Sequence, residues 1–322
     1  MKPVLLVQGV QSMDEVPGLD SLRDEVEIRV ASTVDELRAE LPGSDVLLGW
    51  NFRADSLREA WPAADRLRWI HWAGAGVDAA MFDELVSSDV QLTNARGVFD
   101  QPMAEWVLGR IIGFAKRFQQ TFADQAAAEW QYRMSERIAG KTALVVGVGS
   151  IGRAIGRLLT AAGMQVEAVG RSARDGDADF GHVFGIADLH ERLGRADYVV
   201  LITPLTAETR GLFGVAEFAA MKASARFINV GRGALVVEEA LLAALGDGTI
   251  AGAALDVFVE EPLPADSPFW NAPNCVVSPH MSGDYLEFET AMAQQFLDNW
   301  ALFCAGDALN NRVDKQLGFA AR

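Results

Sequence analysis

Residues 142–157 read TALVVGVGSIGRAIGR, and this stretch decides the fold. The apolar run at 143–146 has the length and composition of a buried parallel strand. Three glycines follow in the spacing G-x-G-x-x-G, and the chain continues as the helix-like segment AIGRLLTAAG. With a strand before it and a helix after it, this spacing is typical of a turn that binds a dinucleotide pyrophosphate. The stretch therefore predicts a dinucleotide-binding strand–turn–helix unit.

The glycines of this turn have separate roles. Gly147 permits a tight turn, Gly149 lets the backbone approach the pyrophosphate, and Gly152 lets the helix pack close to the strand. The N-terminus of the helix that follows offers unpaired N–H groups and a positive dipole end, which attract phosphate. A plain strand-to-helix turn without a ligand is the alternative, and the flanking pattern disfavours it.

The residues at the tip of the next strand indicate which dinucleotide binds. The strand expected at 165–169 ends in Gly170-Arg171-Ser172, with Arg174 close by. NAD users carry an acidic residue at this tip for the ribose hydroxyls. An arginine and a hydroxyl instead suit a 2′-phosphate, because guanidinium pairs with phosphate bidentately. We therefore expect NADP(H) as the preferred cofactor and NAD(H) as the alternative; the competing interpretation is that these arginines are solvated loop charges.

Length and composition limit which classes of protein fit the chain. The chain has 322 residues, half of them hydrophobic, which is enough for two domains with cores of their own. The net charge of −16 disfavours nucleic acid and anionic membranes as partners. Cys275 and Cys304 lack metal-type spacing and are expected to be small buried hydrophobes in a reducing compartment. No apolar run is long enough for a membrane span or a secretory signal, so we expect a cytoplasmic protein without a metal.

The first hundred residues form an α/β unit in this interpretation. A Thr33–Glu36 capping pattern begins a helix over 33–41. The turn Gly74-Ala75-Gly76-Val77 follows an apolar strand, and its N–H groups can hold a carboxylate; a simple strand-to-helix turn explains it equally well. Strands are expected at 4–8, 26–30, 45–49, 67–72 and 90–93.

The rest of the chain continues the α/β pattern. Pro102 begins a long amphipathic helix that extends through 122–130, and this extension is a candidate subunit contact. A last helix over 285–305 and a tail at 309–313 return to the first domain. Further strands are expected at 197–203, 225–230, 251–257 and 275–278.

This pattern predicts an α/β fold of two Rossmann-like domains with doubly wound parallel sheets. Residues 1–99 and 286–322 are expected to form a substrate-binding, flavodoxin-like domain. Residues 100–285 are expected to form the dinucleotide-binding domain, with the active site in the cleft between the two.

Arg232 is the candidate for binding an anionic substrate. It lies between two glycines after a buried strand, where the carboxyl ends of parallel strands bind ligands. An arginine there can pair bidentately with a substrate carboxylate. A purely structural arginine would place its charge against the positive end of a helix, which is unfavourable.

His280 is the candidate general acid or base among four histidines. His71 lies in an apolar strand and is expected in the core, whereas His182 and His190 are expected to be solvated. A neighbouring carboxylate would stabilise the protonated imidazole. Glu260 and Glu261 both qualify for that role, and their spacing from His280 does not choose between them.

Together these motifs resemble the D-isomer-specific 2-hydroxyacid dehydrogenase family over almost the whole chain. The stretches that carry the likeness are GAGVD at 74–78, TNARGV at 93–98, GVGSIG at 147–152, TPLTAETRGL at 203–212, NVGRGALVVEEAL at 229–241, LDVFVEEPLPADSPFW at 255–270 and SPHMSG at 278–283.

The resemblance implies roles for individual residues. Arg232, Glu261 and His280 would be catalytic, with Glu261 preferred over Glu260 because the family's glutamate directly precedes proline. The backbone of Ala75, Gly76 and Val77 would bind the substrate carboxylate, and a homodimer would form around the long helix. The cofactor contacts would be Gly147, Gly149, Ser150, Ile151, Gly152, Arg171, Ser172, Arg174, Thr203, Pro204, Val230, Gly231, Arg232, Asp256, His280 and Ser282.

The chain departs from the NAD-using members, which carry aspartate at the position of Gly170. With Arg171 and Ser172 next to it, it resembles the NADP(H)-preferring branch of glyoxylate, hydroxypyruvate and other 2-ketoacid reductases. This implies reduction of a small 2-keto acid to the D-2-hydroxy acid. One alternative is a dinucleotide-sensing binding protein on the same fold, like the C-terminal binding protein corepressors. Another is an NAD-dependent member acting on another small anion, such as formate or phosphite; formate enzymes pair glutamine with histidine, so Glu261 disfavours that substrate.

Overall fold

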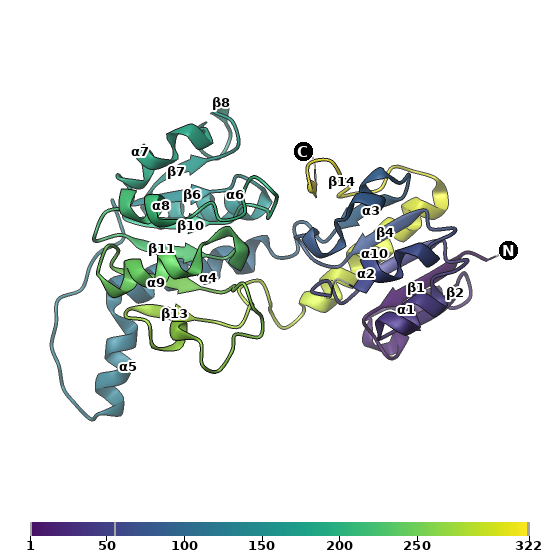
Figure 1. Cartoon of the computed structure of the whole chain (residues 1–322), viewed down its shortest axis with the longest axis horizontal. Coiled ribbons are helices and arrows are strands. Elements are labelled where there is room, and N and C mark those ends of the chain that lie inside the picture. The colour runs from purple at the N-terminus through teal and green to yellow at the C-terminus, as the bar shows by residue number, and fades with distance from the viewer. Residues whose placement is uncertain (1, 55, 321–322) are drawn as a thin grey trace. The chain divides into compact units, whose positions relative to one another are not determined.

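The protein is described from a computed structural model that covers residues 2–54 and 56–320 (Figure 1). The chain divides into two compact units. Unit 1 comprises Met1–Phe99 and Tyr285–Arg322, and unit 2 comprises Asp100–Asp284. The division assigns Tyr285 to unit 1, one residue before the boundary expected from the sequence.

Unit 1 contains a five-stranded parallel sheet in the order β2-β1-β3-β4-β5. This order is that of flavodoxin-like folds. The apolar runs predicted these strands to within two residues, because a parallel sheet buried on both faces needs near-continuous apolar sequence. The strands are β1 (Val4–Gln8), β2 (Glu27–Ala31), β3 (Val46–Gly49), β4 (Trp69–Trp72) and β5 (Gln91–Asn94).

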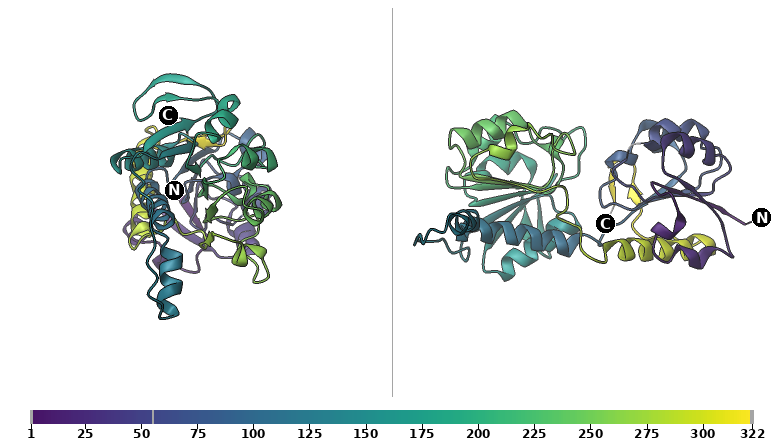
Figure 2. Two further views of the ribbon diagram at one scale, coloured as in Figure 1. Left: turned by 90° about the vertical axis from the view of Figure 1, so that its left-hand side faces the viewer. Right: turned by 90° about the horizontal axis from the view of Figure 1, so that it is seen from below.

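Helices cover both faces of this sheet (Figures 1 and 2). On one face, Phe296 of α10 stacks on Trp69 with ring centroids 5.4 Å apart. The predicted capping box is confirmed, since the Thr33 hydroxyl accepts from Glu36 N at 3.2 Å and the Glu36 carboxylate accepts from Thr33 N. The helices are α1 (Val34–Glu40), α2 (Ser56–Ala60), α3 (Asp83–Ser87) and α10 (Phe288–Ala305), with 3₁₀ turns η1 (Met13–Glu15), η2 (Leu19–Leu22), η3 (Trp61–Ala63) and η4 (Asp78–Ala80).

The C-terminal segment packs on unit 1. It forms a short hairpin of β14 (Val313–Asp314) and β15 (Phe319–Ala320). Between these strands, the ammonium of Lys315 donates to the carbonyls of Leu85, Ser88 and Val90 at 2.6–2.9 Å. The tail therefore belongs to the first domain, as the sequence predicted.

Unit 2 contains a six-stranded parallel sheet in the order β13-β12-β11-β10-β6-β7. The chain starts at β6, adds β7 on one side and then crosses to β10 on the other. The carboxyl ends of β6 and β10 are therefore a topological switch point, where such sheets bind ligands. The strands are β6 (Thr142–Val146), β7 (Gln165–Val169), β10 (Tyr198–Leu201), β11 (Arg226–Asn229), β12 (Gly252–Leu255) and β13 (Cys275–Val277).

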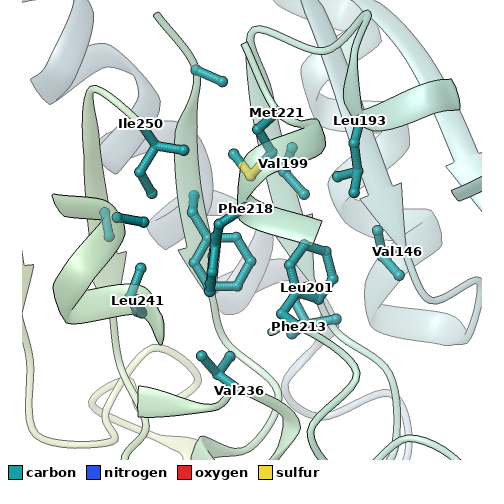
Figure 3. Packing of buried hydrophobic residues seen from close by; sticks show 14 of the residues in the cluster. Val146, Leu193, Val199, Leu201, Phe213, Phe218, Met221, Val236, Leu241 and Ile250 are labelled. Carbon is teal, nitrogen blue, oxygen red and sulfur yellow. The ribbon is translucent and has the colours of Figure 1, made fainter. Parts of the chain in front are cut away.

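The helices of unit 2 form layers on both faces of its sheet, with α4 and α6 on one face and α8 and α9 on the other (Figure 2). Figure 3 shows Phe213 and Phe218 in the apolar cluster on the second face. Phe218 meets Phe227 edge to face at 5.3 Å. The helices are α4 (Asp100–Lys116), α5 (Phe118–Ala126), α6 (Ser150–Ala161), α7 (Leu189–Leu193), α8 (Val215–Ala220) and α9 (Glu238–Gly246), with 3₁₀ turns η5 (Ile186–Asp188), η6 (Gly233–Leu235) and η7 (Pro268–Asn271).

The single helix predicted from Pro102 through Trp130 was wrong in its extent. Helix α4 begins at Asp100 and ends at Lys116, because Arg117 adopts a left-handed backbone conformation with φ 56°. Helix α5 then extends away from the sheet of unit 2 (Figure 1). Apolar periodicity cannot reveal one left-handed residue, so it overestimated the length of the helix.

A small hairpin after β7 was not predicted from the sequence. It consists of β8 (Arg174–Asp177) and β9 (Gly181–Val183).

Within residues 2–54 and 56–320, no helix combines the length and apolar character that a membrane span requires.

Candidate active site

The predicted glycine turn lies between β6 and α6. Gly147 has φ +120°, and a Cβ there would lie 2.6 Å from the Ile202 carbonyl oxygen. A Cβ on Gly152 would lie 2.0 Å from the Gly147 carbonyl oxygen. Both contacts exclude any larger residue.

Gly149 differs from its neighbours because a Cβ there would meet no atom within 4 Å. It is the N-cap of α6, and no side chain caps that end of the helix. Ser150 and Ile151 are the first residues of the helix and are partly exposed. Open space before an uncapped helix N-terminus fits the pyrophosphate of a dinucleotide.

Thr203 and Gly231 meet beside this turn, beyond the ends of β10 and β11. A Cβ on Gly231 would lie 3.2 Å from the Thr203 carbonyl oxygen. The Thr203 hydroxyl is buried and has no hydrogen-bond partner among the residues that the structure describes. A buried hydroxyl without a partner is unfavourable, so it fits a polar atom of a ligand. Pro204 is exposed next to it, and Val230 is buried.

The tip of β7 carries the residues predicted for the 2′-phosphate. Arg171 and Ser172 are exposed, whereas Arg174 lies on β8 and donates to Asp177. A Cβ on Gly170 would lie 3.0 Å from Val148 Cγ2 and 3.2 Å from a methyl group of Val183. This crowding gives a steric reason for glycine at the position where NAD users carry an acid.

The Arg232 side chain contacts the preceding residue, and Asn229 holds the backbone of both residues. Its Nη1 donates to the Gly231 carbonyl at 2.8 Å. The Asn229 amide donates to the Arg232 carbonyl and accepts from Gly231 N. A Cβ on Gly233 would lie 1.9 Å from the carbonyl carbon of Phe258, so this glycine is required by close packing.

His280 and Glu261 form a hydrogen-bonded pair. His280 Nδ1 lies 2.6 Å from Glu261 Oε2, and Glu261 Oε1 accepts from Phe258 N at 2.9 Å. Both side chains are about one third exposed or less, at 26% and 31%. Glu260 is exposed to solvent. Glu261 is therefore the carboxylate that contacts the imidazole.

The electrostatics of the pair involve Arg232 as well. Burial raises the pKa of Glu261, whereas the hydrogen bonds from His280 and Phe258 N lower it. The positive charges of His280 and Arg232 act in the same direction, so the pKa of Glu261 lies below its ordinary value. Arg232 is thus within electrostatic range of Glu261, and an ionised Glu261 stabilises a protonated His280.

Asp256 holds the turn that carries His280. Its side chain is fully buried. Its carboxylate accepts from the Ser278 hydroxyl at 2.5 Å, from Met281 N at 3.1 Å and from Ser282 N at 2.8 Å. The structure therefore brings Asp256 and Ser282, both predicted cofactor contacts, into contact with each other. The sequence did not reveal this clamp, because its partners lie more than twenty residues away.

Unit 1 contains the predicted carboxylate-binding turn after β4. The Asn94 side-chain amide donates to the Ala75 carbonyl at 2.6 Å, and Ala95 N donates to the Gly74 carbonyl at 3.0 Å. Ala75 and Gly76 are partly exposed, while Val77 is buried. The turn is thus fixed through its carbonyl oxygens.

The other histidines do not join this cluster. His71 is fully buried, as predicted, and its Nδ1 lies 2.8 Å from the Thr93 hydroxyl. His182 contacts Asp175 and His190 contacts Glu217, so each has a carboxylate partner that the sequence did not predict. In the described residues, no group of three or more histidine, cysteine or acidic side chains is arranged to hold a metal.

Known proteins resemble this chain in sequence and in structure. Residues 108–282 match the model of the NAD-binding domain of the D-isomer specific 2-hydroxyacid dehydrogenases. A glyoxylate/hydroxypyruvate reductase B from Klebsiella pneumoniae is 34% identical over 317 residues, which cover 96% of this chain and 93% of that protein.

Two solved structures cover nearly the whole chain. A D-isomer specific 2-hydroxyacid dehydrogenase from Xanthobacter autotrophicus, solved with NADPH and MES, is 28% identical with a TM-score of 0.84, covering 99% of this chain and 100% of that one. An NADPH-dependent glyoxylate/hydroxypyruvate reductase from Sinorhizobium meliloti, solved with NADP and sulfate, is 29% identical with a TM-score of 0.83 and the same coverage. The family match spans more than half of the chain and includes the glycine turn, Arg232, Glu261 and His280. The chain therefore belongs to the D-isomer-specific 2-hydroxyacid dehydrogenase family.

Proposed function

We propose that the protein is an NADPH-dependent reductase that converts a small 2-keto acid, such as glyoxylate or hydroxypyruvate, to the D-2-hydroxy acid. The observation that carries this proposal is the His280–Glu261 hydrogen bond, with Arg232 in electrostatic range of the pair. The names of the Klebsiella and Sinorhizobium relatives support the substrate class. NADP-bound relatives support the cofactor, and NAD(H) is the alternative.

Several features of unit 2 suit a bound dinucleotide. The open space at Gly149, the helix end at Ser150 and Ile151, and the buried hydroxyl of Thr203 suit a bound dinucleotide. When bound, the cofactor supplies a hydride to the carbonyl carbon. The remaining proposed contacts are Gly147, Gly152, Arg171, Ser172, Arg174, Pro204, Val230, Gly231, Arg232, Asp256, His280 and Ser282.

Arg232 is proposed to bind the substrate carboxylate and to polarise the carbonyl. A guanidinium can donate two parallel hydrogen bonds to a carboxylate, which fixes the orientation of the substrate. Positive charge near the carbonyl oxygen stabilises the negative charge that develops there. The N–H groups of Ala75, Gly76 and Val77 are proposed as further donors to the carboxylate.

His280 is proposed to give the proton that completes the alcohol. Because Nδ1 contacts Glu261, the transfer is assigned to Nε2. One hydride on carbon and one proton on oxygen convert the keto group to a hydroxyl group. Glu261 keeps the imidazole oriented through its contact with Nδ1 until this transfer.

Turnover on a panel of substrates tests the proposal. Glyoxylate, hydroxypyruvate, pyruvate and phenylpyruvate are each assayed with NADPH and with NADH, and chiral analysis identifies the product. We expect reduction of at least one small 2-keto acid to the D-product, with a higher kcat/KM for NADPH. Binding of cofactor without reduction of any 2-keto acid would instead indicate a dinucleotide-sensing protein.

We also propose a homodimer that forms through the arm at 118–138. This arm exposes large apolar side chains, of which Trp130 is 99% exposed, Tyr132 86% and Phe122 64%. Arg226 donates to the Glu136 carboxylate at 2.6 Å and anchors the returning end of the arm to β11. Exposed apolar patches of this kind mark protein–protein contacts. Light scattering should give twice the mass of the chain, and Phe122→Asp combined with Trp130→Asp should reduce it to the monomer mass.

A cytoplasmic location is proposed from the cysteines. Cys275 and Cys304 are both free thiols. Cys275 is partly buried, and burial raises its pKa to about 12. Cys304 is exposed, so the expectation that it is buried was wrong. Free thiols are typical of a reducing compartment. Fractionation of source cells with an antibody against the protein tests this location.

A further inference from the structure

Asp177 lies between two arginines in unit 2. Arg153 donates to both of its oxygens, from Nη1 to Oδ1 at 2.8 Å and from Nη2 to Oδ2 at 2.7 Å. Arg174 donates to Oδ2 from Nε at 3.2 Å and from Nη2 at 2.9 Å. The Asp177 side chain is only 2% exposed. One buried carboxylate therefore fixes two guanidinium groups.

The two arginines belong to the two ends of the proposed cofactor site. Arg153 lies in the first turn of α6, where its N donates to the Gly149 carbonyl at 3.0 Å. Arg174 Nη1 lies 3.7 Å from the position that a Cβ on Gly170 would take. Asp177 thus connects the helix of the glycine turn to the tip of β7, where a dinucleotide's adenosine ribose binds.

The orientation of Arg174 suits a second anionic partner. A guanidinium has five N–H donors in a planar fork. Asp177 engages the Nε and Nη2 atoms of Arg174, whereas Nη1 is the nitrogen directed to Gly170. The same arginine can therefore bind Asp177 along one edge and a phosphate from Nη1.

The carboxylate stays charged under assay conditions. Hydrogen bonds from Arg153 hold the pKa of Asp177 far below its ordinary value; burial opposes them, and Arg174 adds to them. An arginine held in place before binding loses less rotational freedom when a ligand arrives. Preorganisation of this kind strengthens binding only for a ligand that Arg174 contacts.

We propose that Asp177 is a positioning residue for cofactor specificity. It holds the Arg174 guanidinium at the tip of β7 so that this group meets the 2′-phosphate of NADP(H), and Asp177 itself does not touch the cofactor. The inference rests on the NADP(H) preference in the proposed function. Asp177 thereby selects NADPH over NADH indirectly, through Arg174.

Asp179 offers a matched control on the same hairpin turn. It accepts from Arg153 Nη1 at 2.6 Å and from Arg157 Nη1 at 3.0 Å. It is also largely buried, with its side chain 16% exposed. Its ion pairs are therefore with Arg153 and Arg157, not with Arg174, so it reports on the general effect of losing a carboxylate here.

The experiment measures dissociation constants without substrate, from the fluorescence of reduced nicotinamide. The variants are Asp177→Asn, Asp179→Asn, Arg174→Gln and the double variant Asp177→Asn with Arg174→Gln. Asp177→Asn should weaken NADPH binding about tenfold and NADH binding less than about twofold, since charge-assisted contacts are lost only with the phosphate. Asp179→Asn should change neither constant by more than about twofold.

A double-mutant cycle separates positioning from a general loss of structure. In the Arg174→Gln background, Asp177→Asn should cause no further loss of NADPH affinity, because there is no guanidinium left to position. Equal losses for NADPH and NADH in Asp177→Asn, or a further loss in the double variant, overturns the proposal. Circular dichroism and thermal melting confirm that each variant is folded.

Arg174→Lys tests the same claim if Asp177→Asn does not fold. Lysine keeps the charge but has a single nitrogen, so it cannot bind Asp177 and a phosphate from separate atoms. It should lose nearly as much NADPH affinity as Arg174→Gln, and wild-type affinity overturns the proposal. The binding measurements need no turnover, so the two proposals can fail separately.

If the variants show the expected dissociation constants but the wild-type protein reduces no keto acid, only the proposed reaction is rejected. If the wild-type protein is active but the Asp177 or Arg174 variant that folds loses NADPH and NADH affinity equally, only the positioning role is rejected.

Discussion

Glu261 accepts a 2.6 Å hydrogen bond from His280 and has a pKa below its ordinary value. The same carboxylate accepts from Phe258 N, so its orientation is fixed by the backbone and not by His280 alone. An acid that stays ionised at neutral pH stabilises the imidazolium that the proposed reduction consumes. The carboxylate therefore fixes the orientation of the proposed proton donor.

Replacing Glu261 with glutamine should change the pH dependence of reduction. Glutamine has no charge, so the variant loses the attraction between the Glu261 carboxylate and a positive charge on His280. The pH above which kcat/KM falls should therefore move downward, and the rate at neutral pH should fall about tenfold or more. A pH–rate profile from pH 5 to 9 measures both effects.

Glu260→Gln is the matched control for that profile. Glu260 is the neighbouring carboxylate and is exposed. Its removal should leave the pH–rate profile unchanged. A profile that shifts equally in both variants would assign the effect to general surface charge, contrary to the specific role of Glu261.

Arg232→Lys should separate substrate binding from cofactor binding. Lysine keeps the charge but cannot pair with a carboxylate bidentately. We expect kcat/KM for the keto acid to fall on the order of 10²-fold, while NADPH affinity falls much less because the proposed contacts at the glycine turn remain. Steady-state kinetics with a fluorescence titration distinguishes the two. A large loss of NADPH affinity with normal substrate KM would contradict the assignment.

Gly149→Ala tests whether the turn binds the cofactor closely. A Cβ at this position meets no protein atom within 4 Å, and φ is −72° with ψ −171°, which an L-residue tolerates. The melting temperature should therefore stay within about 2 °C of wild type. NADPH affinity should fall, because the methyl group occupies space needed by the pyrophosphate.

Gly246→Ala is the control for this substitution, because a Cβ there also meets open space, at the end of α9. It should preserve both stability and cofactor affinity. Gly152→Ala should instead destabilise the fold by roughly 1–3 kcal/mol, since its Cβ overlaps the Gly147 carbonyl. Unchanged NADPH affinity in folded Gly149→Ala would argue against the proposed position of the pyrophosphate.

Burial of His71 should make unit 1 less stable in acid. Burial lowers the pKa of His71 from 6.5 to about 3, so the folded state keeps the ring neutral where the unfolded state is protonated. The unfolded state thus binds more protons between these values, and stability is complete above pH 6.5 and lost as pH falls. The loss from pH 7.5 to 5.0 should be about 2 kcal/mol.

Urea unfolding of wild type and His71→Phe at several pH values measures this contribution. Phenylalanine has no ionisable group, so the variant should lose less stability between pH 7.5 and 5.0. Lowered carboxylate pKa values, such as that of Glu36, act mostly below pH 5 and are common to both proteins. Parallel curves for the two proteins would show that His71 does not cause the acid sensitivity.

The strands were predictable because each has a simple physical signature. The run at 143–146 is continuously apolar, as a strand covered by helices on both faces must be. The predicted ends were too late at 203 and 257, since the last two residues of each run lie beyond the end of the strand, at the carboxyl edge of the sheet. Apolar sequence thus identified the strands but not where each one ends.

The connections were harder to predict because their determinants are not periodic. Arg117 interrupts the long helix through its backbone conformation, which no side-chain pattern records. The β8–β9 hairpin contains the polar sequence RDGD and has no apolar alternation. The ion pair of Arg153 with Asp177 joins residues 24 positions apart, so sequence alone cannot place them together.

Turnover of His280→Ala tests the central claim most directly. The variant lacks the group proposed to protonate the carbonyl oxygen, while Gly149 and the rest of the glycine turn are unchanged. We predict that kcat for keto-acid reduction falls on the order of 10²- to 10⁴-fold, with a folded protein that still binds NADPH through the remaining proposed contacts. A folded His280→Ala protein that reduces the same keto acid at the wild-type rate would contradict the proposed mechanism.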